Sequence, residues 1–220
     1  MFKRQTEIKI KSLVFDMDGV LVDTSPSHSK AYDKLWQSLS IKGPEYSEIA
    51  GRSTKEVVAE YASHLNAKQL LEAVAFKQST ALEILNTADI SYVDTLSALQ
   101  NLQARGLSMA VATSASRASA EMALQSAGIA HFFSAVITSA DVERAKPAPD
   151  LFQAGIRALG CEPTHTLIFE DSQSGLLAAM ASGAYVVAVR EVPELDDSIV
   201  ASDSFLGYFG SLNAVVEALV

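Results

Sequence analysis

The chain has 220 residues, of which 49% are hydrophobic and 20% are charged, so it is large enough to fold around an apolar core and too apolar for a disordered chain. Its 17 basic and 26 acidic residues give a net charge of −9, which argues against nucleic acid or an anionic membrane as a partner. The single cysteine, Cys161, excludes an internal disulfide and fits a reducing compartment. Because the sequence also lacks a membrane-length apolar stretch and a signal-peptide pattern, we expect a cytoplasmic protein.

Five short apolar runs, each leading into polar residues, predict buried strands. They lie at 13–15, 108–113, 135–138, 166–169 and 185–189. The runs are continuous rather than alternating, which favours a parallel sheet covered on both faces. Helical patterns separate the later strands, at 95–105, 116–127, 149–159 and 174–182, and a glycine follows each of them, as at many helix ends. This alternation predicts an α/β fold with a Rossmann-like, doubly wound parallel sheet.

The tail of the chain carries two further signals. Residues 204–210 predict a last strand or a turn, and residues 212–219 predict a helix that packs on the core.

Residues 25–90 interrupt the alternation, because they contain helical patterns and no convincing strand. A connection of that length inside a compact sheet domain is usually functional. We therefore expect an all-helical cap at 25–90, inserted over the carboxyl edge of a core formed by 1–24 and 91–220.

Local signals support helices in this insert. Ser25 and Pro26 suit an N-cap followed by proline at the first helical position. Ser53 and Glu56 have the spacing of a capping box. Residues 67–85 are rich in good helix formers.

Polar clusters follow four of the predicted strands. In chain order they are Asp16 with Asp18, Thr113 with Ser114, Lys146, and Glu170 with Asp171. Open α/β sheets bind ligands just beyond the carboxyl ends of their strands, so we expect these side chains to converge. Four carboxylates in one crevice repel each other and need a cation, and oxygen donors alone suit Mg²⁺. A carboxylate nucleophile, a lysine and hydroxyl donors beside such a cation outline a phosphoryl-transfer site.

The segments FDMDGVLVDT, VATSAS, AKPAPDLF and FEDSQSG resemble, in this order, the four motifs of the haloacid dehalogenase superfamily. The resemblance spans nearly the whole chain. The helical insert is similar to the alpha-helical cap of beta-phosphoglucomutases and many sugar-phosphate phosphatases. Asp18 disfavours a true dehalogenase, since those enzymes attack carbon and usually lack an acid at this position.

The resemblance implies a role for each acid. Asp16 would be the nucleophile and a ligand of Mg²⁺. Asp18 would be the general acid and base, with its backbone carbonyl also on the metal. Asp171 would bind Mg²⁺, and Glu170 would bind it directly or through water.

The other motif residues would bind the phosphoryl group. Ser114 would hold it, with Thr113 as the alternative and Ala115 beside them, and Lys146 would balance the charge between nucleophile and phosphate.

The resemblance also suggests substrate-binding residues at the entrance and inner face of the cap. These are Thr24, His28, Gly51, Arg52, Lys55 and Lys77. His28 would position Asp18 or contact substrate hydroxyls, and it is equally compatible with a half-buried hinge residue. Arg52 and Lys55 would bind a second phosphate or acid group of the substrate, and Lys77 sits where relatives often place a cap lysine. The alternative for all three is a solvated charge on a helix face.

The predicted function is Mg²⁺-dependent phosphoryl transfer through an aspartyl-phosphate, most simply by a phosphatase acting on a sugar or polyol phosphate. One alternative is a phosphomutase of the beta-phosphoglucomutase type, which EDSQSG favours. Arg117 and Ala118 disfavour it, because mutases carry a lysine and an asparagine there. The other alternative is a non-catalytic binding module, although no motif is missing. We expect a monomer, because the cap already covers the site.

Overall fold

In the computed structural model, which describes residues 9–49, 52–190 and 195–219, six parallel strands form one sheet in the order β3-β2-β1-β4-β5-β6. The strands are β1 (Ser12–Phe15), β2 (Ser108–Ala112), β3 (Ala135–Ile137), β4 (Thr166–Glu170), β5 (Tyr185–Val189) and β6 (Phe205–Phe209). Five of them coincide with the predicted apolar runs, and the tail forms the sixth. The strand order reverses between the neighbours β1 and β4, so a ligand site is expected beyond their carboxyl ends.

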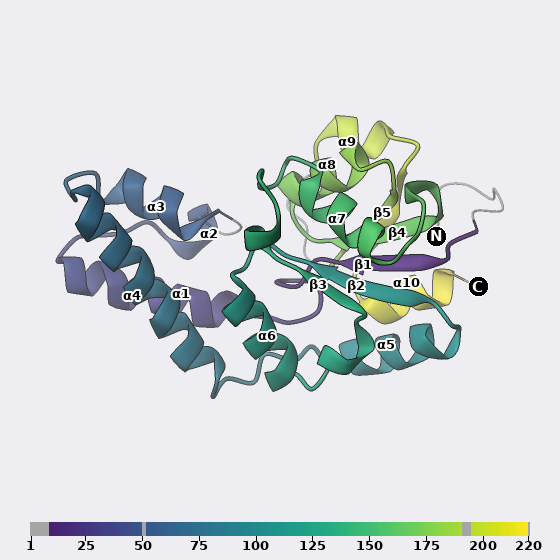
Figure 1. The fold of residues 1–220 in the computed structure, drawn as a ribbon, viewed down its shortest axis with the longest axis horizontal. Helices are drawn as coiled ribbons and strands as arrows, with labels where there is room; N and C mark the ends of the chain where they lie inside the picture. The colour runs from purple at the N-terminus through teal and green to yellow at the C-terminus, as the bar shows by residue number, and fades with distance from the viewer. Residues whose placement is uncertain (1–8, 50–51, 191–194, 220) are drawn as a thin grey trace.

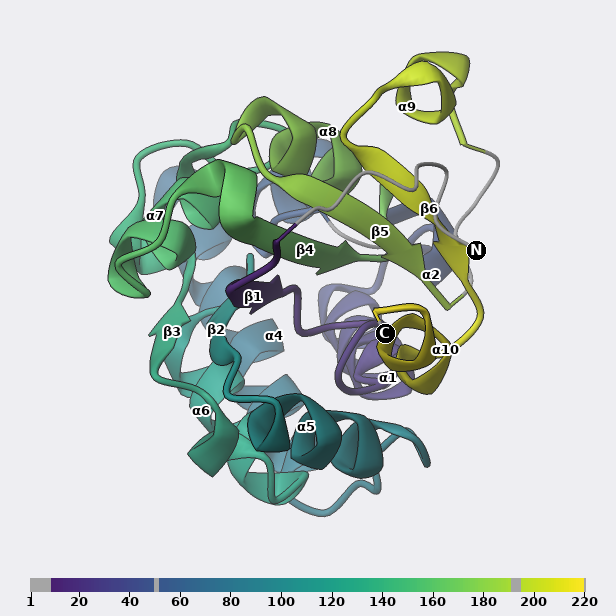
Figure 2. The ribbon, with the colours of Figure 1, turned by 90° about the vertical axis from the view of Figure 1, so that its right-hand side faces the viewer.

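Helices cover both faces of the sheet (Figure 2). One face packs against α5 (Thr95–Ala104), α6 (Arg117–Ser126) and α10 (Leu212–Ala218), and the other against α7 (Asp150–Ala158), α8 (Gln173–Ala181) and α9 (Asp197–Ala201). Along β1, Leu13 and Phe15 belong to the first apolar core and Val14 to the second. Burial on both faces explains the continuous apolar runs. Short 3-10 turns lie at Ala130–Phe132, Ser139–Asp141 and Pro163–His165.

Of the five described helices between β1 and β2 in the sequence, the first four stand to one side of the sheet (Figure 1). They are α1 (Ser25–Leu39), α2 (Tyr46–Ile49), α3 (Thr54–Tyr61) and α4 (Ala67–Leu85). We call them the cap helices. They have an apolar core of their own, which includes Leu35, Trp36 and Val58. The described part of 25–90 contains no strand, as the sequence predicts.

The start of α1 differs from the sequence-based expectation. Ser25 is the first helical residue, and Thr24 is the N-cap. The hydroxyl of Thr24 makes no capping bond because it donates a hydrogen bond to Asp18 instead. At α3, Ser53 is the N-cap and its hydroxyl accepts a hydrogen bond from the backbone N–H of Glu56, which is one of the two bonds of the predicted capping box.

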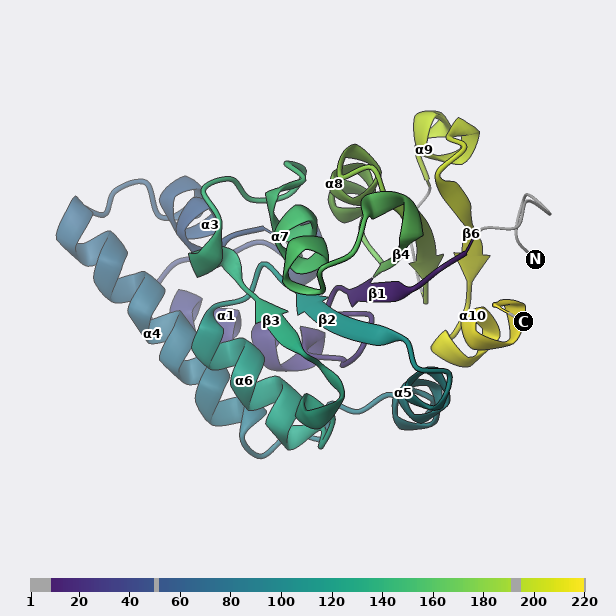
Figure 3. The same cartoon turned by 45° about the vertical axis from the view of Figure 1, so that its right-hand side comes forward.

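Two chain segments connect the cap helices to the sheet, at 16–24 and 86–94. They pair with each other, since the backbone N–H of Asp23 donates to the carbonyl of Ile90 at 2.8 Å. The cap helices also reach the core directly, where α4 packs along α6 (Figure 3). None of the described helices is long and apolar enough to cross a membrane.

Candidate active site

Lys146 lies between two acids at the carboxyl edge of the sheet. Its Nζ atom is 2.5 Å from a carboxylate oxygen of Asp16, which follows β1, and 2.5 Å from one of Glu170, which ends β4. Asp16, Glu170 and Asp171 each offer an oxygen within 4.8 Å of the others. The structure therefore brings together three of the predicted acids and the predicted lysine.

The electrostatics of this cluster favour a bound cation. Burial raises the pKa of Asp16 to about 7, against the opposing charge of Lys146. Burial and the neighbouring Glu170 raise the pKa of Asp171 to about 9. Burial lowers the pKa of Lys146. The negative charges of Asp16 and Glu170 have the larger combined effect, so the net result is a raised pKa. One lysine thus does not balance the acids, and a cation with a preference for oxygen ligands, such as Mg²⁺, fits the donor set.

Glu170 is held by more than Lys146. Its second carboxylate oxygen accepts hydrogen bonds from the backbone N–H of Asp171 at 2.7 Å and from the backbone N–H and hydroxyl of Ser172 at 2.6 and 3.0 Å. A side chain at Gly175, in the first turn of α8, would collide with this carboxylate. Glycine is therefore required for Glu170 to reach Lys146.

Asp18 accepts hydrogen bonds from two hydroxyls. Thr24 donates to one carboxylate oxygen, and Thr113 donates to the other at 3.4 Å. The next residue, Gly19, has a φ of 82°, and a side chain there would collide with Asp171. The backbone of this turn therefore brings Asp18 and Asp171 to the same site.

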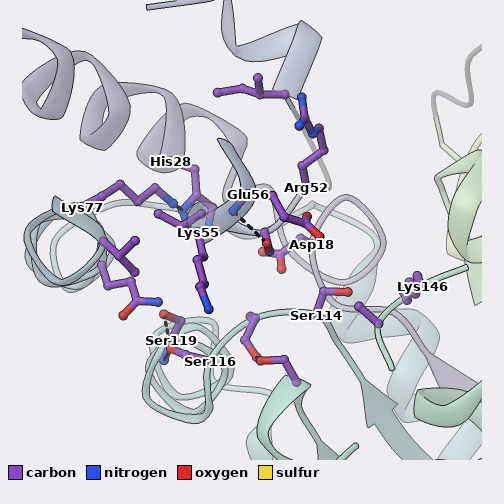
Figure 4. Close-up of a pocket in the computed structure, with 18 of the residues that line it drawn as sticks. Asp18, His28, Arg52, Lys55, Glu56, Lys77, Ser114, Ser116, Ser119 and Lys146 are labelled. Atoms are coloured by element: carbon purple, nitrogen blue, oxygen red, sulfur yellow. Dashed lines mark hydrogen bonds between the residues drawn. The ribbon is translucent and has the colours of Figure 1, made fainter. Parts of the chain in front are cut away.

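A cavity of about 520 Å³ separates the cap helices from this cluster. From the core it is lined by Asp18, Ser114, Ala115 and Lys146. Thr113 is buried, and its hydroxyl donates a hydrogen bond to Asp18. Of the two hydroxyls proposed for the phosphoryl group, Ser114 is therefore the one that faces the cavity (Figure 4).

Two predicted cap residues form a pair on the opposite wall. Nζ of Lys77 on α4 lies 2.9 Å from Nδ1 of His28 on α1 and 4.5 Å from the centre of the Tyr32 ring. Burial lowers the pKa of Lys77 to about 8. Burial and the charge of Lys77 lower the pKa of His28 to about 4.

The remaining cap candidates differ in their surroundings. Arg52 lines the cavity, but its guanidinium is paired with Glu60 at 2.5 Å and both side chains are well exposed. Lys55 extends across the cavity from α3 (Figure 4), and within the described ranges no carboxylate pairs with it. Gly51 lies outside the described residues.

Several further polar side chains line the cavity, although none of them was proposed from the sequence as a site residue. They include Tyr46, Glu56, Gln78, Ser116, Ser119, Ser139 and Glu143. Ser116 and Ser119 lie within hydrogen-bond distance of each other at 2.9 Å, on the core wall that Lys55 approaches in Figure 4. Ser116 is the last residue of the VATSAS segment, and Glu56 was indicated only as part of a capping box, whereas no sequence signal marked the others.

Comparison with known proteins identifies the family. The family model for haloacid dehalogenase-like hydrolases matches residues 13–189, which include all four motifs. The chain belongs to this family. The predicted superfamily and the predicted Rossmann-like α/β fold are both confirmed.

Two of the curated relatives of this hydrolase are named as phosphatases of small phosphorylated compounds. Fructose-1-phosphate phosphatase YqaB from Escherichia coli is 32% identical over 188 residues, which cover 81% of this chain and 95% of that protein. Validoxylamine A 7'-phosphate phosphatase from Streptomyces hygroscopicus subsp. limoneus is 29% identical over 185 residues, or 81% of this chain and 85% of that protein. These matches confirm the predicted enzyme class, a haloacid dehalogenase-like phosphohydrolase.

Among solved structures, CbbY from Rhodobacter sphaeroides in complex with phosphate has a TM-score of 0.80 at 21% identity and covers 92% of this chain and 95% of its own. A beta-phosphoglucomutase from Clostridium difficile has a TM-score of 0.75 at 19% identity, with coverage of 82% and 84%. At these identities the likeness shows a shared fold.

Proposed function

We propose that this hydrolase is a Mg²⁺-dependent phosphatase that acts on a small phosphorylated metabolite, a sugar or polyol phosphate, through an aspartyl-phosphate. The observation that carries the proposal is the position of Lys146 between Asp16 and Glu170, at the end of a cavity that Asp18 and Ser114 also line. The substrate class is supported by the relatives, which include a fructose-1-phosphate phosphatase and a hexitol phosphatase.

The first half-reaction transfers the phosphoryl group to the protein. The Asp16 carboxylate attacks phosphorus in line with the leaving oxygen, and the bond from phosphorus to that oxygen breaks. Asp18 gives its proton to the departing alcohol. Lys146 and Ser114 stabilise the charge on the transferring group.

The second half-reaction releases phosphate. A water molecule gives a proton to Asp18 and attacks the phosphorus of the aspartyl-phosphate, so that the Asp16 carboxylate and inorganic phosphate are regenerated. Asp16, Asp171 and the Asp18 carbonyl would hold Mg²⁺, with Glu170 as a direct or water-mediated ligand. When bound, the cation neutralises charge on the phosphate and lowers the pKa values of the acids.

The helical cap at 25–90 closes this site against the core at 1–24 and 91–220 in the proposed cycle. The cavity between them takes up the substrate, and closure excludes bulk water from the phosphorus. Thr24 donates a hydrogen bond to Asp18. His28 and Lys77, on the opposite wall of the cavity, are proposed to position Asp18 or to contact the substrate. Lys55 is the proposed ligand for the end of the substrate that is remote from phosphorus.

A phosphomutase is the second candidate, and the side chains after Ser114 argue against it. Arg117 is directed away from the cavity, since its guanidinium donates to Asp141 at 2.6 Å and to the carbonyl of Val136 at 3.2 Å. Ala118 has no hydrogen-bonding side chain. A sugar phosphate would therefore lack two of the polar partners expected in a mutase, and water is the simpler acceptor.

We further propose that the phosphatase works as a cytoplasmic monomer. The cap and core of one chain supply every residue of the proposed site, and the single cysteine suits a reducing compartment.

The proposal is tested by phosphate release from a panel of sugar and polyol phosphates, with and without Mg²⁺ and with Asp16→Asn as the inactive control. Beta-glucose 1-phosphate is included with a coupled assay for glucose 6-phosphate. Mg²⁺-dependent phosphate release that Asp16→Asn abolishes supports the phosphatase. Isomerised sugar phosphate with little free phosphate supports the mutase instead, and binding without turnover supports the non-catalytic module.

A further inference from the structure

Arg190, which follows β5, makes an unusual set of contacts for a residue outside the four motifs. Its backbone is left-handed, with a φ of 65°, and its side chain is 11% exposed. The guanidinium donates to the carbonyl of Val20 at 2.9 Å and to the hydroxyl of Thr95 at 3.2 Å. It also pairs with Asp94 at 3.0 Å and lies 3.6 Å from the centre of the Tyr92 ring.

These contacts join the two segments that connect cap and core. Val20 lies between β1 and α1, and the other partners lie between α4 and the start of α5. Thr95 in turn donates to the carbonyl of Leu21 at 2.9 Å, so Arg190 and Thr95 satisfy two consecutive carbonyls of fully buried residues. Without these donors the two carbonyls would be buried and unpaired, which destabilises the turn.

Asp94 extends the network to α10, which packs beside α5. Its second carboxylate oxygen accepts from the backbone N–H of Leu212 at 2.7 Å and of Asn213 at 3.3 Å, in the first turn of α10. The ion pair with Arg190 is nearly buried, with side chains 11% and 12% exposed. Removing one partner of such a pair leaves a charge without compensation.

The turn that Arg190 holds also carries Asp18. The backbone N–H of Gly19 donates to the carbonyl of Val22 at 2.8 Å, and Asp18 and Val22 form a bridge. Val22 forms a second bridge, with Ser91 in the other connecting segment. The Val20 carbonyl and the backbone of Asp18 therefore belong to one hydrogen-bonded turn.

We propose that Arg190 is a positioning residue. Its guanidinium holds the connecting segments 16–24 and 86–94 together and so keeps Asp18 in place to protonate the leaving alcohol. This inference rests on the proposed function, in which Asp18 is the general acid. The proposal gives a role in the chemical step to a buried guanidinium that lies outside the cavity.

The test compares two substrates that differ in their need for an acid. A hexose phosphate releases an alkoxide that must be protonated, whereas p-nitrophenyl phosphate releases a stable phenolate. The parameter kcat/KM reports the step in which this group leaves. We compare wild type, Arg190→Gln and the control Arg105→Gln, which removes an exposed arginine bonded to Asn101 on α5.

In Arg190→Gln we expect kcat/KM for the hexose phosphate to fall by about tenfold or more, a part of the factor that general acid catalysis supplies. The value for p-nitrophenyl phosphate should change by less than about threefold. A merely structural role would lower the active fraction and reduce both values equally, which would overturn the inference. Unchanged values for both would overturn it as well.

A second variant covers a failure of Arg190→Gln to fold. Arg190→Lys keeps a positive charge but has one nitrogen in place of the separate Nε and Nη donors that bind Val20 and Asp94. It should show the same substrate-selective loss. Hydrolysis of neither ester by the wild type would instead overturn the proposed function, and this inference with it.

Discussion

Nζ of Lys77 and Nδ1 of His28 lie 2.9 Å apart, although 49 positions separate the residues in the sequence. The lowered pKa values, about 4 for His28 and about 8 for Lys77, mean that at neutral pH the imidazole is neutral and accepts a hydrogen bond from the lysine ammonium. The pair joins α1 to α4 on the cavity wall and keeps one cation near Asp18, whose charge acts on both groups.

This pair predicts a specific pH dependence of stability. Between the ordinary His28 pKa of 6.5 and its folded value of about 4, the unfolded chain binds a proton that the folded chain excludes. The stability contribution is therefore present above pH 6.5 and is lost as the pH falls through this range. Wild type should lose about 2–3 kcal/mol more than His28→Gln over the interval. Urea unfolding at several pH values measures the difference, with the exposed His64→Gln as control. Parallel curves for wild type and His28→Gln would contradict a neutral, buried imidazole.

Lys146 is expected to be essential for turnover. Lys146→Met leaves Asp16 and Glu170 without their cationic partner. It also removes the positive charge that is proposed to stabilise the transferring phosphoryl group. By analogy with the loss of one preorganised donor, kcat should fall by about 10²–10³-fold. Steady-state phosphate release measures this effect, and Lys68→Met, on an exposed part of α4, should retain the activity of wild type. A variant of Lys146 with near-normal kcat would refute the role of its ammonium group.

Gly175→Ala tests the close approach of α8 to Glu170. The added methyl group meets the Glu170 carboxylate, so either the helix or the carboxylate must move. We expect a loss of about 1–3 kcal/mol in unfolding free energy, as for other overpacked positions, together with weaker Mg²⁺-dependent activity. Gly210→Ala is the matched control, because a side chain there meets nothing within 4 Å. Equal melting temperatures for the two variants would contradict the tight packing at Gly175.

Lys55 and Arg52 are expected to differ in their effect on substrate binding. Lys55 faces the cavity without a described carboxylate partner, whereas Arg52 is already paired with Glu60. For a substrate with a second anionic group, Lys55→Met should raise KM by about tenfold, the equivalent of one charge-assisted hydrogen bond. Arg52→Met should raise it much less. The measurement is the KM of each variant for a sugar bisphosphate and for the corresponding monophosphate. A larger increase in KM for Arg52→Met than for Lys55→Met would show that Arg52, not Lys55, binds the second anionic group.

Much of the core was predictable because its signals are local. The strands stand out as apolar runs since helices bury both faces of the sheet, as Val14 and Phe15 show by packing into opposite cores. The carboxyl ends of parallel strands share one edge of the sheet. Asp16 follows β1, Glu170 ends β4 and Lys146 lies in the loop after β3, so their convergence could be predicted from sequence.

Other features depend on contacts between distant segments. The sequence left open whether Thr113 or Ser114 faces the cavity. In the fold Thr113 is buried and donates to Asp18, and Ser114 lines the cavity. The pairing of Arg52 with Glu60 was equally hidden, because it depends on how α3 follows its N-cap. Arg190 carries no motif, and only the folded chain shows that the segments before α1 and after α4 share its guanidinium.

The central claim is that Asp16 becomes phosphorylated, and Asp18→Asn allows the most direct measurement of it. With p-nitrophenyl phosphate the first half-reaction needs little help from an acid, whereas the second lacks its base, so the intermediate should accumulate. The measurement is mass spectrometry of peptides from Asp18→Asn after mixing with p-nitrophenyl phosphate and Mg²⁺ and quenching with acid. The account predicts one added phosphoryl group on Asp16. An unmodified Asp16 peptide, or a phosphoryl group on another residue, would contradict it.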